Sequence, residues 1–445
     1  MAIRSRYAQT LYGVIKMKCH LKAKVTNMFP GTLKAGALLY AILLSVLVCG
    51  IMASVMLFQQ YSQFHFMHRL RTEQLISNVH SALNLAMNDR NLFQQTSVIE
   101  LDLFGEGTDS VAIRRRPWGL YSSISVAAHS RELEYTRSVL SGVIDHNLPV
   151  LYLSDRDKPL SLCGNTLIRG RAVIPKAGFK RAYIEGRSFQ GNRFCDGKVE
   201  ESSRNLPELK PELLDGLKAA LWSDSSPEDS IVTELPDSVW RSFSKSTIHL
   251  QSNGLIQIRD RQWSGNVIVQ SKTRIEVHAD AVLDNVFLIA PIVEFEHDFS
   301  GKIQVLASDS ILTGKGCTFL YPSSFVTLST KEHPSPSVIR LDEDCKLEGS
   351  LLSWMERINL REFPVFTLNA RSEIVGWVYC NGFSDIKGRI EGSLFTQMFL
   401  LKTPAAVYEN HLLGATLDAT SLPSHFAGPS IFPGYQPSTV MSWLE

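Results

Sequence analysis

The sequence lacks the short motifs that mark the common enzyme classes. There is no G-x-S-x-G nucleophile elbow, Walker A loop, H-E-x-x-H zinc motif or dinucleotide-binding glycine pattern in its 445 residues. The chain also has almost no net charge, +1 at pH 7, so its charge balance gives no indication of a nucleic acid or an acidic polymer as partner. These absences favour a non-enzymatic protein that uses no cofactor.

Cysteine is scarce, and its spacing matches no known framework. The seven cysteines include no C-x-x-C pair and no cysteine–histidine ligand spacing, which argues against a disulfide scaffold and a structural zinc site. Cys163 and Cys195 are the one pair that we consider for a disulfide, and the sequence leaves their redox state open. Cys317, Cys345 and Cys380 are expected to act as small apolar residues of strands.

One stretch lacks charge and proline altogether. From Ala35 to Phe58 the side chains are apolar or aromatic except for Ser45 and Ser54. A helix of this length spans roughly 36 Å, enough for the ~30 Å hydrocarbon core of a bilayer. A buried soluble helix would show a polar stripe, and a cleaved secretory signal has a shorter apolar core, so we expect a retained transmembrane helix. Its anchor residues are Ala35, Gly36, Leu38, Leu43, Leu47, Gly50, Val55 and Phe58.

Acidic residues are absent from the basic arm, residues 1–34, which carries seven lysines and arginines. Because basic segments are retained in the cytoplasm, this arm is expected inside and residues 59–445 outside. We therefore expect a single-pass protein of a bacterial inner membrane, with its C-terminal region periplasmic or extracellular. Met17 and Met28 are alternative starts, and the sequence does not decide whether the arm is cleaved.

The helical pattern continues beyond the apolar stretch to about Asn88. Short alternating runs then follow at Val98 to Phe104, Val111 to Arg115 and Trp118 to Ala128. A helix followed by antiparallel strands is an α+β arrangement in which the sheet covers one side of the helix. We predict such a unit over residues 59–150.

Short strands punctuated by glycine dominate the remaining sequence, first in residues 151–203 and again, after a helical insertion and linker at 204–235, in residues 236–402. Ile275-Glu276-Val277 aligns without gaps with Val293-Glu294-Phe295 at a shift of 18. Such a period predicts a parallel β-solenoid, whereas a β-sandwich, the alternative, would have longer strands and hairpin turns. Residues 403–445 are expected to cap the open end of the solenoid.

One polar cluster stands out in the repeat. His278 and His297 lie at nearly equivalent places in successive coils, close to several carboxylates. Imidazole and carboxylate groups can bind a metal or transfer protons, but equivalent residues of a repeat stack at turns whatever their function. We therefore assign no catalytic, cofactor-binding or metal-binding residue. The candidate cluster comprises His278, Asp280, Glu294, Glu296, His297 and Asp298.

The stretch from Lys34 to Leu44, KAGALLYAILL, resembles the N-termini of minor pilins and pseudopilins of type IV pilus and type II secretion systems. Members of these families begin with a short basic leader, a glycine before the cleavage point and an apolar helix. The resemblance implies cleavage after Gly36, which would leave Ala37 as the mature terminus. Most members carry Glu at the fifth mature position, where this chain has Ala41.

The coils at 159–191 and 255–395 resemble bactofilins, which are polymer-forming β-solenoids of the cytoplasm. Because the charge bias places these coils outside, only the architecture is carried over. The predicted fold is mainly β: a parallel β-solenoid ectodomain preceded by a long transmembrane helix and a small α+β, pilin-like domain.

We expect a structural or assembly component of the cell envelope, whose partners are the membrane and other pilus-like assembly proteins. The alternative is a membrane-tethered protein that binds or cleaves polysaccharide, with surface glycan as its partner. A groove lined by aromatic rings and carboxylates would favour this alternative, whereas inward-pointing rings would favour the structural role. The candidate rings are Trp263, Phe287, Phe319, Tyr321, Trp377 and Tyr379.

Overall fold

The structure is a computed structural model that divides into two compact units, Met1–Leu70 and Arg71–Glu445. The basic arm and Ala35 lie outside the residues that it describes. One helix, α2 (Gly36–Asn88), begins in the first unit and ends in the second. The described residues are 36–88, 98–105, 107, 109–131, 133–222, 230–232, 234–335, 337–356, 363–434 and 436–444.

The described part of the first unit is the N-terminal part of α2, residues 36–70. Every residue from Gly36 to Leu70 is exposed. The absence of proline and of charge up to Phe58 allows an uninterrupted helix whose backbone groups bond to one another.

In the second unit the last turns of α2 pack on an antiparallel sheet. Leu75, Val79, Ala82, Leu83 and Ala86, spaced three or four residues apart, are all buried. Every second residue of the sheet strands points toward this helix. The buried residues on this face include Val111, Ile113, Ile124, Val126 and Val139. Before residue 150 this sheet has one strand more than the alternating runs of the sequence indicated. Its strands are β1 (Ile99–Leu101), β2 (Ser110–Trp118), β3 (Tyr121–Ser130) and β4 (Leu133–Val143).

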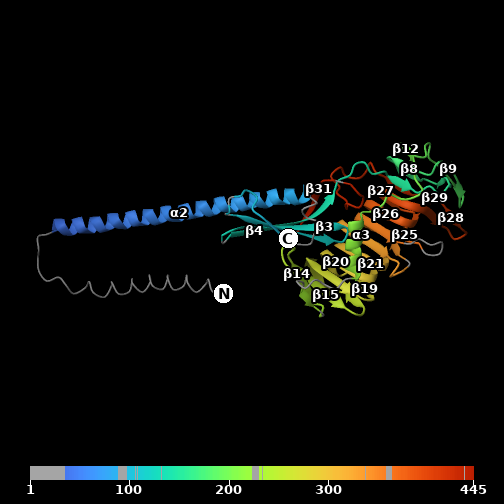
Figure 1. Ribbon diagram of the computed structural model, residues 1–445. Helices are drawn as coiled ribbons and strands as arrows, with labels where there is room; N and C mark the ends of the chain where they lie inside the picture. Colours follow the sequence, from blue (N-terminus) through green and yellow to red (C-terminus); the bar gives the residue numbers. More distant parts are fainter. Residues whose placement is uncertain are drawn as a thin grey trace. The chain divides into compact units, whose positions relative to one another are not determined.

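A fifth strand of this sheet comes from the other end of the chain. β31 (Ser438–Leu444) pairs antiparallel with β4, and the strand order is β1-β2-β3-β4-β31. The strands β5 to β30 therefore form an insertion between two neighbouring strands of one sheet. Figure 1 shows β3 and β4 near the last turns of α2 and the strands of the insertion beyond them.

The insertion is a parallel, solenoid-like stack. Ile275 pairs with Val293 and Val277 with Phe295, the register that the gapless shift of 18 residues predicted. Each coil turns through three short faces, and apolar side chains from all faces fill one continuous core. Its strands are β13 (Ser230–Val232), β14 (Ser238–Arg241), β15 (Ile248–Ser252), β16 (Ile256–Ile258), β17 (Gln262–Gly265), β18 (Val267–Ser271), β19 (Arg274–Val277), β20 (Val282–Phe295), β21 (Ser300–Thr313), β22 (Thr318–Ser329), β23 (Val338–Leu341), β24 (Lys346–Met355), β25 (Val365–Leu368), β26 (Glu373–Ile386) and β27 (Arg389–Lys402).

Both ends of the insertion extend this stack beyond β27. β5 pairs with β27 and with β8, and β30 pairs with β27 and with β7. The region 151–203, which the sequence separated from the solenoid, thus continues the same ladder. The strands of these two ends are β5 (Leu151–Leu153), β6 (Leu160–Cys163), β7 (Leu167–Arg169), β8 (Ala172–Ile174), β9 (Phe179–Arg181), β10 (Tyr183–Ile184), β11 (Arg187–Ser188), β12 (Val199–Glu201), β28 (Val407–Glu409), β29 (His411–Leu413) and β30 (Thr416–Asp418). Of these, β6, β9 and β29 form a separate parallel sheet, β10 and β11 pair antiparallel with each other, and β28 pairs antiparallel with β27.

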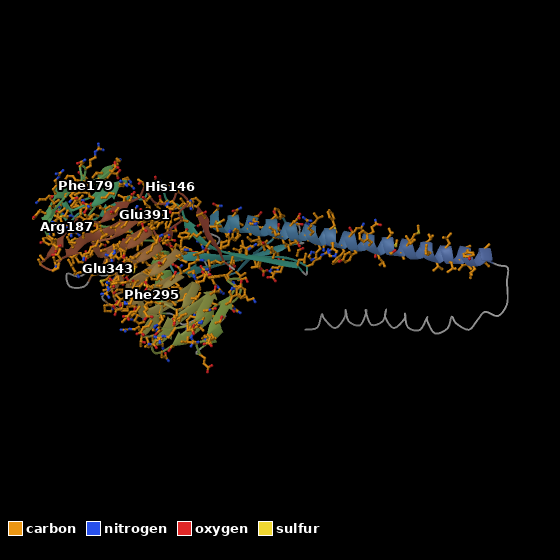
Figure 2. The ribbon with its side chains drawn as sticks, turned by 180° about the vertical axis from the view of Figure 1, so that it is seen from behind. His146, Phe179, Arg187, Phe295, Glu343 and Glu391 are labelled. Atoms are coloured by element: carbon orange, nitrogen blue, oxygen red, sulfur yellow. The ribbon has the colours of Figure 1, made fainter. Side chains whose placement is uncertain are left out.

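The tail 403–445 does not cap the solenoid, in contrast to our expectation. β30 lies inside the ladder, between β27 and β7, and β31 completes the antiparallel sheet. Instead, β9 to β12 lie at that end. Figure 2 shows Phe179 and Arg187 there, far from Phe295 in the coils near the other end. The sequence could not predict this arrangement because the pairings of β5 with β27 and of β7 with β30 join strands that are remote along the chain.

The outer side of the middle solenoid face is also apolar, and other elements cover it. The helix α3 (Pro211–Trp222) lies over β20 and β21 and buries Leu217. The tip of the β2–β3 hairpin adds Trp118 and Tyr121 to the same cluster. The coils are therefore buried on both sides along this face.

Candidate functional site: the apolar helix and the solenoid corner

Within the described residues, α2 is the one helix long and apolar enough to cross a bilayer. Its segment up to Phe58 carries no charged side chain, and none of that segment is buried. All the predicted anchor residues from Gly36 to Phe58 are exposed, and the predicted cleavage point, Gly36–Ala37, lies in the first turn of the helix. Such a helix could anchor the chain in a membrane by its length and composition.

The two serines of this segment are compatible with a hydrocarbon environment. The Ser45 hydroxyl donates to the carbonyl of Ile42 and the Ser54 hydroxyl to that of Ile51, both at 2.8 Å. A hydroxyl bonded within its own helix exposes little unpaired polarity to lipid.

The candidate polar cluster lies at a corner of the solenoid between β19 and β21. His278 Nδ1 is 2.9 Å from Glu296 Oε2 and 3.2 Å from a guanidinium nitrogen of Arg259. The Ala279 N–H also donates to Glu296, at 3.4 Å. This backbone bond, together with the hydrogen bond to His278, lowers the pKa of the Glu296 carboxyl.

The other four residues of the cluster point to different partners. His297 Nδ1 accepts a hydrogen bond from the Lys315 N–H at 2.9 Å, so that bond extends to the next coil. Asp280 accepts from the Asp260 N–H at 3.0 Å, whereas Glu294 lies 3.5 Å from Arg274. Asp298 occupies the left-handed conformation of a turn, with φ of 61°. Among the described residues, no three His, Cys, Asp or Glu side chains converge to hold a metal ion.

The same corner continues as a column of alternating charges. Lys315 lies 3.0 Å from Glu343, and Arg371 of a later coil lies 3.4 Å from Glu343 and 2.6 Å from Asp344. Figure 2 shows Glu343 at the edge of the coils. The polar residues of this corner satisfy turn amides and neutralise each other, which is a structural role.

The aromatic residues considered for a glycan groove are withdrawn from solvent. Trp263 and Phe319 point into the coil core and are 1% and 0% exposed. Phe287, Trp377 and Tyr379 lie on the outer side but are covered, and the half-buried Tyr321 donates its hydroxyl hydrogen to the Ala427 carbonyl at 2.9 Å. These six rings do not form an exposed row, so the glycan alternative gains no support from them.

One open pocket of about 300 Å³ lies where the cover of the middle face ends. Its floor includes Tyr152 and Phe395, which are stacked with centroids 5.9 Å apart. Arg171 and Glu200, at its rim, pair at 2.9 Å, and hydrogen bonds from Lys198 and Arg171 lower the pKa of Glu200. The pocket contains no pair of groups suited to acid–base catalysis.

Six cysteines fall within the described residues, and the structure joins no two of them in a disulfide. Burial raises the pKa of the Cys195 thiol to about 11, and its sulfur donates to the Gly170 carbonyl at 3.4 Å. Cys163 and Cys380 are fully buried, with pKa values that burial also raises. Cys317 and Cys345, which the sequence offered only as apolar strand residues, lie in neighbouring coils.

Sequence reasoning missed the junction between the antiparallel sheet and the solenoid. The Trp118 ring lies 5.0 Å from that of Phe243 and 5.5 Å from that of Phe287. Between Trp118 and Leu120, Gly119 adopts φ of 62°, and a Cβ there would come within 3.0 Å of Gln304. The available signal was an apolar turn, Trp118-Gly119-Leu120-Tyr121, where a solvent-exposed hairpin would be polar.

No family model matches the chain, and no curated protein matches it. Among solved structures, it is similar to the crystal structure of the competence-associated pilin ComZ from Thermus thermophilus. The two share 10% sequence identity with a TM-score of 0.23, over 84% of this chain and 96% of that one. A TM-score of this size does not establish a common fold, and the likeness to bactofilins is not confirmed.

Proposed function

We propose that the protein is a membrane-anchored, pilin-like structural component that carries a β-solenoid outside the cytoplasm. The observation that carries the proposal is the division of α2, whose first half is exposed and apolar while its last turns form the core of an antiparallel sheet. This is the construction expected of the pilin and pseudopilin N-terminus that the stretch from Lys34 resembles. The apolar part of α2 anchors the chain, and the antiparallel sheet on its last turns carries the inserted solenoid.

The insertion gives this component its distinctive part. Because β4 and β31 pair on either side of it, the solenoid can be large without interrupting the packing of helix on sheet. The corner residues around Glu296 are bound to turn amides and to each other, which supports a presenting role over a catalytic one. The partners would be neighbouring apolar helices, which the small residues Gly36, Ala41 and Gly50 allow to approach closely.

The proposal is tested by the N-terminus of the mature chain. The full chain is produced in a bacterial host with and without a prepilin peptidase, extracted from membranes and sequenced from its N-terminus. We expect Ala37 as the first residue only when the peptidase is present. A Gly36→Leu variant, which keeps the helix apolar but removes the glycine before the cleavage point, should stay uncut.

A peptidase that processes an authentic pilin in the same cells but leaves this chain intact would refute the pilin-like assignment. A parallel variant tests the anchor itself. Leu47→Arg places a charge at the centre of the apolar segment, at a cost of about 2.5–3.5 kcal/mol, and should release protein from the membrane fraction. Gln63→Arg, beyond the apolar segment, is the matched control and should remain in the membrane.

A further inference from the structure

Two buried cysteines stand next to each other across successive coils. Thr318 of β22 pairs in register with Lys346 of β24, and the Lys346 N–H donates to the carbonyl of Cys317 at 2.8 Å. Cys317 and Cys345 each precede one of these partners, so they occupy the same place in two adjacent coils. Their exposed fractions are 0% and 2%.

This neighbourhood meets the distance requirement of a disulfide. Paired strands lie about 4.7–4.9 Å apart, which falls within the Cα separation of about 4.4–6.8 Å found in disulfides. The neighbouring Cys317 side chain also lowers the pKa of the Cys345 thiol. A thiol whose pKa is lowered is more readily present as thiolate, the form that attacks a disulfide.

The bonds that the thiols make in the structure do not require sulfur. Cys317 donates to the carbonyl of Glu296 and Cys345 to that of Gly314, both at 3.0 Å. In the next coil Ser372 fills the equivalent position, and its hydroxyl donates to the carbonyl of Asp342. Since a hydroxyl makes the same corner bond, hydrogen bonding does not explain two consecutive thiols.

The two cysteines stand at the start and end of an extended coil. The register advances 28 residues from Thr318 to Lys346, compared with 18 from Ser300 to Thr318 in the preceding coil. Two of the ten additional residues enter at a register shift within β22, and the others lie between β22 and β23. A bond between Cys317 and Cys345 would close this coil and remove freedom from its unfolded form.

We propose that Cys317 and Cys345 form a disulfide while the protein folds in an oxidising compartment; this rests on the outward placement in the proposed function. The Cys345 thiolate attacks a disulfide of a thiol oxidoreductase, forming a mixed disulfide and releasing one oxidoreductase thiolate. The Cys317 thiol then loses its proton and attacks the sulfur of Cys345, releasing the second. Two thiols lose two electrons and two protons, and the oxidoreductase disulfide gains them as a dithiol.

The experiment maps the thiols of the full chain. Protein from the cell envelope is denatured in acid, alkylated without reductant, digested and analysed by mass spectrometry. We expect the Cys317 and Cys345 peptides linked and lighter by two hydrogen atoms than the sum of the free peptides. Cys163 and Cys380 should be alkylated in the same sample. Two separate, alkylated peptides for Cys317 and Cys345 would contradict the proposal.

A second experiment distinguishes whether the two cysteines can form a disulfide from whether the protein is placed in an oxidising compartment. The purified full chain is refolded in a buffer of oxidised and reduced glutathione and mapped in the same way. If the link forms there but not in cells, the outward placement and the proposed function fail. If it forms in neither, the disulfide itself is refuted.

The Cys317→Ser variant provides a readout of stability. Serine keeps the corner hydrogen bond, so this variant should fold, with Cys345 alkylated. The oxidised wild type should unfold at a higher temperature than the variant, and reductant should abolish the difference. Equal unfolding temperatures before reduction would contradict closure of the coil by a disulfide.

Discussion

The antiparallel sheet and the covered middle face of the solenoid differ in the way their strands are buried. In β3 of the sheet, buried and half-buried residues alternate, because one face lies on α2. In β20 of the solenoid, six consecutive residues are buried, because the core lies on one side and the covering elements lie on the other. The same chain thus contains one-sided and two-sided β-structure, and only the one-sided form has the alternation expected of exposed strands.

The two regions also differ in the way they are closed. One neighbour of β4 in the sheet is β31, which comes from the C-terminal end of the chain. The coils from β14 to β27, by contrast, each pair with the next one along the chain, as β20 does with β21. Damage to a coil should therefore spread to neighbouring coils, whereas damage to the sheet should release α2 and leave the stack folded.

The largest effect is expected from a glycine of the solenoid. Gly349, Gly376 and Gly392 pair in register, and a Cβ on Gly376 would stand 1.7 Å from the carbonyl oxygen of Gly349. Gly376 also has φ of 144°. Gly376→Ala should cost about 4 kcal/mol or more, because backbone atoms must move in two coils.

Chemical denaturation and hydrogen exchange over β24 to β27 measure this effect. Gly254→Ala is the control, because a Cβ there meets nothing within 4 Å. An unchanged denaturation midpoint for Gly376→Ala would mean that these coils are not in close backbone contact.

The second prediction concerns the sheet. Ile124 is 0% exposed and packs in the cluster between β2–β4 and α2. Ile124→Ala should cost about 3 kcal/mol through lost burial and the cavity left behind. Hydrogen exchange should quicken in β2 to β4 and in the last turns of α2, while β20 to β27 keep their protection. Loss of protection in both regions would show that sheet and solenoid unfold as one unit, and the exposed Glu134→Ala should change neither.

Local patterns account for what the sequence predicted. The apolar, charge-free segment predicted the exposed half of α2, and the three- and four-residue spacing after it predicted the helical turns that bury Leu75 and Val79. The alignment of Ile275 with Val293 predicted the register in which β19 and β20 pair. All of these signals depend on residues within about two turns or one coil of each other.

Remote pairings account for what the sequence did not predict. The joining of Leu151 to Leu394, and of β31 to β4, connects residues far apart in the chain, and no local period specifies such pairs. The residues of the polar cluster lie in neighbouring coils, but whether His278 and His297 would face each other depended on side-chain partners. Lys315 and Glu296 determined those partners, and they lie on different coils.

The third prediction tests the cost of two-sided burial. Asp385 is 5% exposed, its Oδ1 has no hydrogen-bond partner among the described residues, and Lys387 lies 3.4 Å away. Burial raises the pKa of Asp385, against the opposing effect of Lys387. A carboxyl with a raised pKa contributes stability that is present below its unfolded pKa and lost as pH rises through its folded pKa.

Asp385→Asn should therefore be more stable than the wild type at neutral pH, by on the order of 1 kcal/mol, and lose this advantage below about pH 4. Denaturation midpoints across the pH range measure the difference. Glu296→Gln is the matched control of opposite sign: the pKa of Glu296 is lowered, so its contribution is present at neutral pH and lost in acid. Parallel pH profiles for the two variants would contradict the assigned environments.

The smallest effect concerns α3, which covers the outer side of the solenoid. Gly216 lies within this helix, and a Cβ there meets nothing within 4 Å. Gly216→Ala should stabilise the protein by about 0.5–1 kcal/mol, because alanine loses less backbone freedom in a helix. Thermal unfolding measures the gain.

Gly119→Ala is the comparison from the other covering element, the β2–β3 hairpin. There the positive φ and the contacts with Gln304 and Ser324 at 3.0 Å oppose a side chain, so the same substitution should destabilise the protein. Opposite signs for the two variants would show that backbone helix propensity limits the stability of α3, whereas close packing limits the residue that fits in the hairpin. If Gly216→Ala also lowers the unfolding temperature, α3 lies closer to the solenoid than its open surroundings at Gly216 indicate.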